Sequence, residues 1–232
     1  TRQPDEPQPT PYPHPGGTMS TLDGAQAHES KLYSDLAYLY DVVFTGIFEK
    51  RIKNVVRSLN IEPGARVLEV GVGTGLSFEA YPIDCQVVGI DLAREMLDKA
   101  QDKINRNGWR HLQVLEMDAL NLKFEDNTFD YAMAFHVVSV VPDDQRLMQE
   151  VMRVTKPGAH IVIINHFISG NRFLAALDRL IEPITRRLGW HTLSLDDVLR
   201  DVPLEVGRVY KTGRRSLFTI VVGRNRKEPV AQ

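Results

Sequence analysis

The sequence predicts an α/β fold: a doubly wound, mostly parallel seven-stranded sheet with an antiparallel last strand, preceded by N-terminal helices. Three observations support this prediction. From residue 65 onward, short runs of Val, Ile and Leu alternate with helical stretches. These runs are apolar at nearly every position, which is typical of strands buried on both faces of a parallel sheet. The last two runs are separated by a short turn, which predicts a closing antiparallel pair.

The elements can be placed in chain order. A helical region over residues 29–59 has apolar residues at spacings of three and four, with Gly46 as a candidate break. An amphipathic helix is predicted near the C-terminal end, at residues 172–190. The strands are predicted at 66–71, 85–91, 111–118, 129–136, 159–167, 204–211 and 215–224, with helices at 94–105 and 143–155.

Four segments follow from this pattern. Residues 1–18 contain six prolines and little apolar sequence, which predicts a disordered N-terminal extension ahead of Met19, a candidate natural start. Residues 19–60 are predicted to form a helical cap, residues 61–226 the sheet domain, and residues 227–232 a disordered tail.

Composition excludes several function classes. The 232 residues carry a formal net charge of −2, which gives no general attraction to nucleic acid. A single cysteine, Cys85, excludes a disulfide framework, and the histidines lack metal-ligand spacing, so we expect no metal. No apolar run reaches the roughly 18 residues of a membrane-spanning helix. We therefore expect a cytoplasmic protein, and we expect it to be a monomer.

The segment VLEVGVGTGLS, residues 67–77, places a glycine-rich loop directly after the first buried strand. Ligands of open parallel sheets bind beyond the carboxyl ends of the strands, and glycines there let a ligand approach the backbone. A dinucleotide loop would need glycine at position 76, which is Leu76, and a phosphate loop would need Lys before Ser or Thr. The loop therefore does not suit a pyrophosphate, although glycines that serve packing alone remain an alternative.

Acidic residues follow the next two strands. Asp91 ends the second strand, where a carboxylate can accept both ribose hydroxyls of a nucleoside. Asp118 ends the third strand and is placed to accept the amino hydrogens of adenine. Either aspartate alone is more often a helix cap or turn residue, but the two together with the loop favour a nucleoside site. The neighbouring residues assigned to this site are Leu92, Met96, Met117 and Ala119.

These motifs resemble the class I S-adenosylmethionine-dependent methyltransferases. The resemblance covers residues 65–167 through ARVLEVGVGTG, VVGIDLAREML, EMDALNLKFEDNTFDYAMAFHVVS and TKPGAHIVIIN. It implies the Rossmann-like methyltransferase fold, with S-adenosylmethionine as cofactor and S-adenosylhomocysteine as product. The sheet domain would then be catalytic, with the helical cap over its active site. By the same resemblance, the methionine part of the cofactor would contact Glu69, Gly71 and Gly73.

A narrower resemblance points to an acceptor. The stretches YLYDVVFTGIFEKRIK, EVGVGTGLSFEAYP, FHVVSVVPDDQRLMQEVMRV, INHF and LGWHT are similar to the bacterial phosphatidylethanolamine N-methyltransferases of the Rhodobacter type. That resemblance implies stepwise methylation of phosphatidylethanolamine to phosphatidylcholine. Two alternatives stay open: methylation of a quinone or another small molecule, and a non-catalytic binding module that keeps the fold.

An amine acceptor needs a residue to position or deprotonate it. An alkylammonium has a pKa of about 10, so roughly one molecule in a thousand is the free amine at neutral pH. Candidates are Tyr33 and Tyr40, which share a face of the leading helix, and His136 and His166, which end the fourth and fifth strands. His136 is also assigned to the cofactor site, because this strand lies nearest the donor methyl in the family resembled.

A phospholipid acceptor also has a phosphate, and guanidinium groups bind phosphate in a two-pronged way. The candidates lie in the C-terminal third: Arg172, Arg179, Arg214, Arg215 and His191. A second basic group follows Ile47 and Phe48 in the leading helix, at Lys50, Arg51, Lys53 and Arg57. Apolar residues flanked by basic ones suit an anionic bilayer. We therefore expect peripheral association with the inner face of the membrane, although packing on the core is the alternative.

Overall fold

The computed structural model describes residues 46, 48–167, 193–213, 216 and 218–228. The chain divides into two compact units, residues 1–45 and 46–232, and every described residue belongs to the second. The helix predicted at 172–190 and the first part of the helical region at 29–59 lie outside the described residues. The rest of that region is helical from residue 48 to residue 58.

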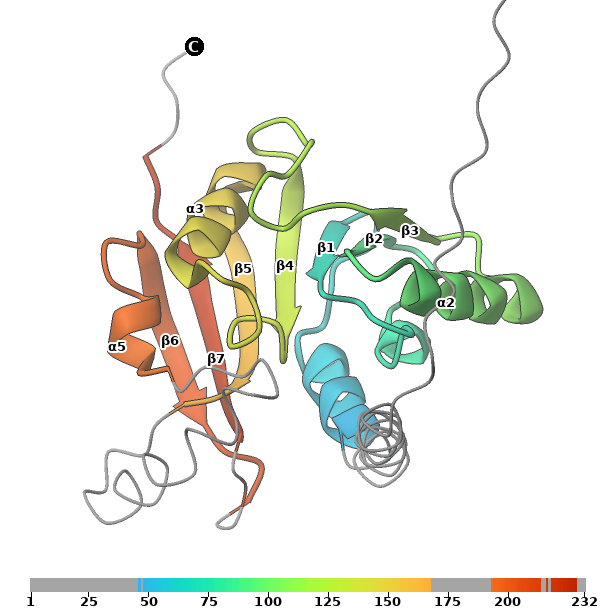
Figure 1. Cartoon of the computed structure of the whole chain (residues 1–232), viewed down its shortest axis with the longest axis horizontal. Helices are drawn as coiled ribbons and strands as arrows, with labels where there is room; N and C mark the ends of the chain where they lie inside the picture. The colour runs from blue at the N-terminus through green and yellow to red at the C-terminus, as the bar shows by residue number, and fades with distance from the viewer. Residues whose placement is uncertain (1–45, 47, 168–192, 214–215, 217, 229–232) are drawn as a thin grey trace, which may run out of the picture. The chain divides into compact units, whose positions relative to one another are not determined.

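A single seven-stranded sheet organises the second unit, with strand order β3-β2-β1-β4-β5-β7-β6 (Figure 1). Strands β1 to β5 are parallel to one another, and β7 is antiparallel to both of its neighbours. This confirms the predicted doubly wound sheet with its antiparallel closing strand. The strands are β1 Arg66–Val70, β2 Gln86–Asp91, β3 Leu112–Glu116, β4 Phe129–Phe135, β5 Thr155–His166, β6 Leu204–Tyr210 and β7 Phe218–Asn225.

Helices cover both faces of the sheet. On one face, the helix ending at residue 58 and α2 (Arg94–Asn107) share a core with the short 3₁₀ turn η1 (Phe78–Ala80). On the other face lie α3 (Asp144–Val154) and α5 (Leu195–Val198). These helices form where their apolar residues recur at spacings of three and four, as at Leu147, Met148 and Val151 of α3, which are all buried.

Strand ends differ from the prediction where the backbone turns. β4 ends at Phe135, one residue early, because His136 has a left-handed φ of 59° that ends the strand. β5 begins at Thr155 instead of residue 159, since Thr155 pairs with Phe129 of β4. The register of β4 and β5 is irregular between Phe129 and Tyr131, opposite the segment that holds Pro157 and Gly158.

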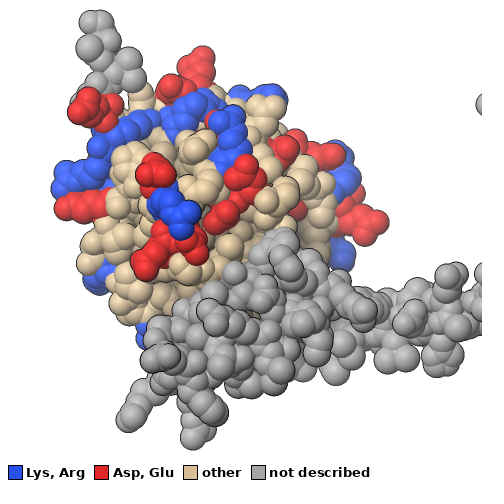
Figure 2. Space-filling model, turned by 60° about the vertical axis from the view of Figure 1, so that its left-hand side comes forward, with Lys and Arg blue, Asp and Glu red and all other residues tan. Residues whose placement is uncertain are grey.

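The surface carries charges of both signs. On the face shown in Figure 2, Lys and Arg side chains alternate with Asp and Glu side chains instead of forming a field of one sign. Ion pairs such as Arg226 with Glu205 and Arg200 with Asp197 account for part of this mixture. Among the described helices, none combines the length and the apolar character needed to span a membrane.

Candidate functional site

The loop after β1 leaves bare backbone open at one glycine. Gly71, Gly73 and Gly75 have φ of 70°, 54° and 70°, a left-handed conformation that glycine adopts without strain. A Cβ on Gly71 would lie 2.8 Å from Val137, and a Cβ on Gly75 would lie 2.2 Å from the Phe78 ring. A Cβ on Gly73 would meet no atom of the described residues within 4 Å. Packing therefore explains two of the glycines, whereas the third leaves space for a ligand beside the backbone.

Asp91, the last residue of β2, joins this loop to the neighbouring strand ends. Its Oδ2 accepts a hydrogen bond of 2.9 Å from the Gly73 amide, and its Oδ1 accepts one of 2.9 Å from the Ala93 amide. Its backbone carbonyl accepts a bond of 3.0 Å from the Met117 amide, just beyond β3. A carboxylate offers about four acceptor positions. Each Asp91 oxygen can therefore accept a further hydrogen bond, as the predicted contact with ribose requires.

The residues predicted to surround a base follow β2 and β3. Asp118 is exposed, and its Oδ1 accepts a bond of 2.8 Å from the Leu120 amide, so it also shapes its own turn. The apolar neighbours range from the buried Ala119 through the half-buried Met96 and Met117 to Leu92, which is 67% exposed. This edge of the sheet therefore offers a surface carboxylate next to partly exposed apolar side chains, which suits a base that carries an amino group.

Glu69 is a buried carboxyl inside β1, only 3% exposed. The hydroxyls of Ser77 and Tyr81 each donate a hydrogen bond of 2.6 Å to its Oε2. Burial raises the pKa of Glu69 to about 7, and the two hydrogen bonds oppose that rise. Sequence reasoning missed both hydroxyl partners, because only the fold of the segment after the glycine loop brings them back to β1.

His136, directly after β4, lies in an aromatic cluster. Its amide donates a bond of 2.7 Å to the Ile164 carbonyl, which holds it beside β5. Its ring centroid is 4.6 Å from that of Phe48 and 4.7 Å from that of Phe218, the latter edge to face. Burial, together with the positive charge of Arg51, lowers the pKa of His136 to about 4. The imidazole is therefore neutral at physiological pH.

The Nε2 atom of His136 is buried and has no hydrogen-bond partner in the part of the chain that the structure describes. Buried polar atoms are satisfied in the great majority of cases, so this exception is consistent with a partner that a ligand supplies. Sequence reasoning identified His136 but not Phe48 or Phe218. The only sequence signal for these two was their place in apolar patterns, which do not distinguish a site wall from the core.

His166 ends β5 beside this cluster, with its ring centroid 6.2 Å from that of Phe218. The neighbouring Asn165 is buried, donates a bond of 3.0 Å to the His166 carbonyl and accepts one of 3.2 Å from the Ser139 hydroxyl. The structure therefore brings two of the predicted acceptor-site residues, His136 and His166, to the same aromatic ring.

The other predicted acceptor-site residues lie outside the described residues. Their roles stay predictions. They are Tyr33 and Tyr40 for the amine, and Arg172, Arg179, Arg214, Arg215 and His191 for the phosphate.

The basic group of the leading helix does not face outward as a whole. Phe48 and Arg51 lie against the His136 cluster, and Lys53 pairs with Glu49 and Glu79. The expectation of one membrane-facing surface is therefore wrong for Phe48 and for two of the four basic residues, Arg51 and Lys53. Lys50 and Arg57 are exposed.

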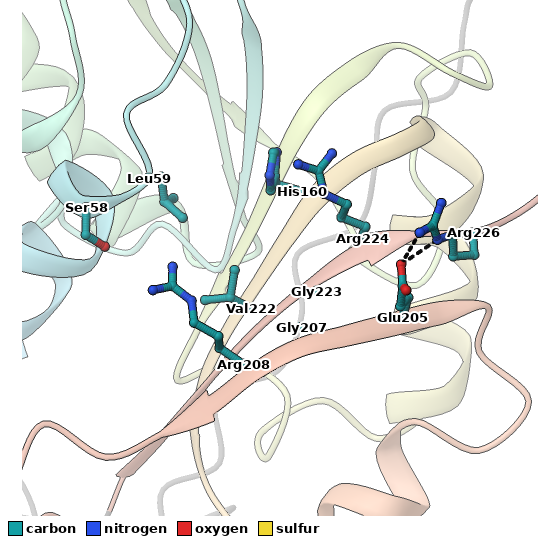
Figure 3. Close-up of a pocket in the computed structure, with 10 residues that line it drawn as sticks. All are labelled: Ser58, Leu59, His160, Glu205, Gly207, Arg208, Val222, Gly223, Arg224 and Arg226. Atoms are coloured by element: carbon teal, nitrogen blue, oxygen red, sulfur yellow. Dashed lines mark hydrogen bonds and ion pairs between the residues drawn. The ribbon is translucent and has the colours of Figure 1, made fainter.

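A surface cavity of about 380 Å³ lies at the other end of the sheet (Figure 3). Its lining includes His160, near the start of β5, and Arg224, near the end of the antiparallel β7. The side chains of Arg208 and Arg224 point into the space between β6–β7 and the end of the leading helix. This cavity is therefore separate from the carboxyl edge, where the glycine loop, Asp91 and His136 lie.

Comparison with known proteins agrees with this geometry. The family described as "Methyltransferase domain" matches residues 68–163. Phosphatidylethanolamine N-methyltransferase of Cereibacter sphaeroides is 38% identical over 185 residues, which are 79% of this chain and 91% of that protein. Demethylmenaquinone methyltransferase of Anoxybacillus flavithermus is 32% identical over 116 residues, 48% of this chain and 49% of that protein.

The fold recurs in solved structures. A SAM-dependent methyltransferase from Aquifex aeolicus superposes with a TM-score of 0.59 at 22% identity, covering 75% of this chain and 89% of that one. At this identity the likeness establishes the fold. The family match and the curated relative extend it to the cofactor, S-adenosylmethionine.

Proposed function

The chain belongs to the class I S-adenosylmethionine-dependent methyltransferases, and we propose that it methylates the amine of phosphatidylethanolamine stepwise, giving the methylated intermediates and phosphatidylcholine. The observation that carries the proposal is the neutral His136, whose buried Nε2 has no partner among the described residues. The 38% identity to phosphatidylethanolamine N-methyltransferase, over 91% of that relative, supports the same acceptor.

The residues at the carboxyl edge fit the cofactor. Bound S-adenosylmethionine supplies a methyl group on a positively charged sulfur and leaves as S-adenosylhomocysteine. Glu69, Asp91 and Asp118 put three carboxyl groups on the strand ends, which complements a cationic ligand. Gly73 leaves its backbone open, and Asp91 holds the loop in place through the Gly73 amide.

His136 is suited to orient an amine and not to remove its proton. A group with a pKa of about 4 cannot hold a proton taken from an ammonium with a pKa of about 10. With its proton on Nδ1, the neutral ring can accept a hydrogen bond at Nε2 from an N–H of the free amine. The amine then keeps its lone pair for the methyl carbon, and its lost proton passes to water.

Arg51 assists this chemistry through charge. It lies close enough for its positive charge to lower the pKa of His136. A cation near an ammonium group favours the neutral amine by the same repulsion. The aromatic rings of Phe48 and Phe218 exclude water from the cluster and can contact a methylated ammonium product.

The proposal places the protein at an anionic membrane surface, where its substrate resides. Lys50 and Arg57 are exposed on the helix that carries Phe48, and each basic residue near an anionic bilayer contributes about 1 kcal/mol. Co-sedimentation with vesicles tests this part: binding should fall as salt rises and should weaken in the Lys50→Glu, Arg57→Glu double variant. Equal binding to neutral vesicles at high salt would contradict it.

The acceptor itself is tested with S-adenosylmethionine labelled in its methyl group. The full chain is incubated with vesicles that contain phosphatidylethanolamine, or with vesicles that contain a demethylated quinone instead. Label in mono-, di- and trimethylated phosphatidylethanolamine supports the proposal. Label in the quinone alone would favour the alternative suggested by the menaquinone-type relatives, and donor binding without any labelled product would favour a non-catalytic module.

A further inference from the structure

Arg51 is a half-buried cation on the acceptor side of the site. Its Nε donates a hydrogen bond of 3.1 Å to the Thr212 hydroxyl, 161 residues along the chain. Its guanidinium carbon lies 5.0 Å from the Phe218 ring centroid and 6.0 Å from that of Phe48. Both rings also contact His136, so the guanidinium and the imidazole share the same aromatic walls.

The guanidinium has a buried donor that no described residue satisfies. Nη1 of Arg51 is buried and has no hydrogen-bond partner among the described residues, and none of their carboxylates pairs with the side chain. Burial lowers the pKa of Arg51 below its ordinary value, so keeping this charge in place costs free energy. A fixed, charged donor without a partner is the arrangement expected where a ligand supplies the anion.

Among the described residues, the other cations of the leading helix and of the surface cavity lack that combination. Lys53 is paired with Glu49 and Glu79, and Lys50 and Arg57 are exposed to solvent, where a bound anion gains little. The arginines of the surface cavity, Arg208 and Arg224, lie at the opposite end of the sheet. Arg51 is therefore the described cation best placed to hold an anion beside His136.

We infer that Arg51 forms the phosphate subsite of the acceptor pocket and binds the phosphodiester of the lipid headgroup while His136 contacts its amine. The inference rests on the proposed function. In an ethanolamine headgroup the nitrogen is joined to phosphorus through two carbons and an ester oxygen, so one short headgroup presents both groups to this cluster. Thr212 fixes the guanidinium through Nε and leaves its other nitrogens for phosphate oxygens.

This subsite would make Arg51 a determinant of acceptor class. A quinone has no phosphate to satisfy the guanidinium, whereas every methylated form of phosphatidylethanolamine keeps its phosphodiester. Binding at Arg51 would therefore hold the headgroup in one place through successive methyl transfers, while the amine changes.

The test compares two acceptors in micelles of an uncharged detergent: phosphatidylethanolamine and a long-chain primary amine without phosphate. In Arg51→Gln the KM for phosphatidylethanolamine should rise at least about tenfold, the factor expected for losing a charge-assisted hydrogen bond, with a smaller change in kcat. The KM for the plain amine should rise less, because that acceptor loses only the effect of the Arg51 charge on its amine and not a phosphate contact. Arg51→Lys should recover part of the loss, because lysine keeps the positive charge but lacks the paired N–H donors of a guanidinium. Arg110→Gln, which changes an exposed arginine ahead of β3, is the matched control.

A binding measurement makes the result independent of turnover. Glycerophosphoethanolamine and ethanolamine are titrated into the full chain in the presence of S-adenosylhomocysteine. The wild type should prefer the phosphodiester, and Arg51→Gln should lose that preference while its affinity for S-adenosylhomocysteine stays the same. Equal affinity of the wild type for the two probes, or equal loss for both acceptors in the variant, overturns the inference. If the wild type shows the preference but never methylates phosphatidylethanolamine, the proposed function fails while the anion site stands.

Discussion

Glu69 joins the cofactor loop to a group of buried hydroxyls, and its charge state is set by burial. A carboxyl whose pKa is about 7 is partly protonated near neutral pH. A cationic donor bound nearby favours the ionised form, so donor binding should release a proton. The pKa of Glu69 is higher in the folded protein than in the unfolded chain, so protonation of Glu69 favours folding. This contribution to stability is complete below pH 4.5 and is lost as pH rises to 7.

We therefore predict that donor affinity rises by up to about tenfold between pH 6 and pH 8 in the wild type. In Glu69→Gln this rise in donor affinity should vanish. The stability of the variant should also vary less between pH 4.5 and 7 than that of the wild type. Calorimetry in buffers of different ionisation enthalpy measures the released proton. The amino group of the donor also titrates in this range, so the quantity to compare is the difference in pH dependence between the wild type and the variant. Identical profiles of donor affinity against pH in the two proteins would contradict the account.

His136 gives a second prediction at this scale. Since its pKa is about 4, it does not titrate between pH 6 and pH 9, and kcat should rise with pH as the acceptor amine loses its proton. His136→Asn keeps a residue that tolerates the left-handed φ of 59°. That variant should lower kcat by about tenfold and keep the slope of the pH profile. A flat profile in the variant would show instead that His136 is the titrating base.

Single residues differ in how far the sequence could identify them. Asp91 and Asp118 follow strand ends, so their location at the carboxyl edge follows from topology alone. Ser77 and Tyr81 became visible as partners of Glu69 only through the fold. Arg51 could not be assigned to the acceptor side, since both Thr212 and Phe218 approach it from the far end of the chain.

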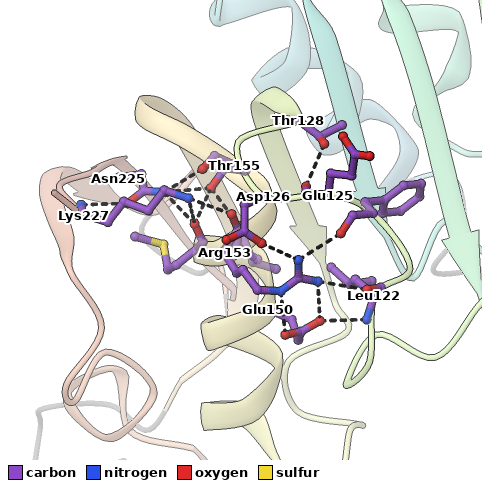
Figure 4. A network of polar contacts seen from close by, with 12 residues as sticks. Leu122, Glu125, Asp126, Thr128, Glu150, Arg153, Thr155, Asn225 and Lys227 are labelled. Atoms are coloured by element: carbon purple, nitrogen blue, oxygen red, sulfur yellow. Dashed lines mark hydrogen bonds and ion pairs between the residues drawn. The ribbon is translucent and has the colours of Figure 1, made fainter. Parts of the chain in front are cut away.

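Among the elements, the contact between α3, β5 and β7 depends on a polar network around the buried Glu150, Thr155 and Asn225 (Figure 4). Arg153 donates hydrogen bonds to Glu150 of α3, to Asp126 and to the carbonyls of Leu122 and Phe124. Asn225, at the end of β7, donates to the Met152 carbonyl and to the Thr155 hydroxyl. The end of the last strand is thereby attached to the start of β5, whose other end carries His166.

Arg153→Met should destabilise this contact by about 3 kcal/mol, because it leaves the buried Glu150 carboxylate without its main partner. The hydrogen bond from Arg153 is the main cause that lowers the pKa of Glu150, so this stabilisation exists above the ordinary carboxyl pKa and is lost as pH falls. Urea unfolding at pH 7 measures the change. Arg94→Met, which removes exposed pairs with Asp98 and Glu116, should cost much less than Arg153→Met. Equal costs for the two variants would contradict the role of the network.

Element positions were largely predictable from periodicity, whereas the orientation of one helix was not. The Val, Ile and Leu runs predicted the five parallel strands, because a buried parallel strand has a continuous apolar pattern, and the short turn between the last two runs predicted the antiparallel pair β6–β7. The helix ending at residue 58 carries Phe48, Arg51 and Lys53 together. Its sequence suits a membrane-facing surface as well as a packed one, and only contacts with distant residues decide between them.

At the scale of the whole molecule, sheet topology brings the residues proposed to bind the cofactor and the acceptor to one edge. The strand order β3-β2-β1-β4-β5 in the sheet places Asp91, the glycine loop, His136 and His166 at the ends of four adjacent strands, β2, β1, β4 and β5. The cofactor half of this edge follows from strand order and spacing, which the sequence encodes locally. The acceptor half depends on residues of the leading helix and the closing hairpin, which meet only in the folded chain.

The most direct test of the central claim, that this edge binds S-adenosylmethionine through Asp91, is a calorimetric titration of the donor into the folded protein and two variants. Asp91→Ala removes the acceptor for ribose and for the Gly73 amide, whereas Asp98→Ala removes an exposed carboxylate of α2. We predict a single site in the wild type, a loss of affinity of at least about tenfold in Asp91→Ala with its circular dichroism spectrum unchanged, and no loss in Asp98→Ala. Wild-type affinity in Asp91→Ala would contradict the account.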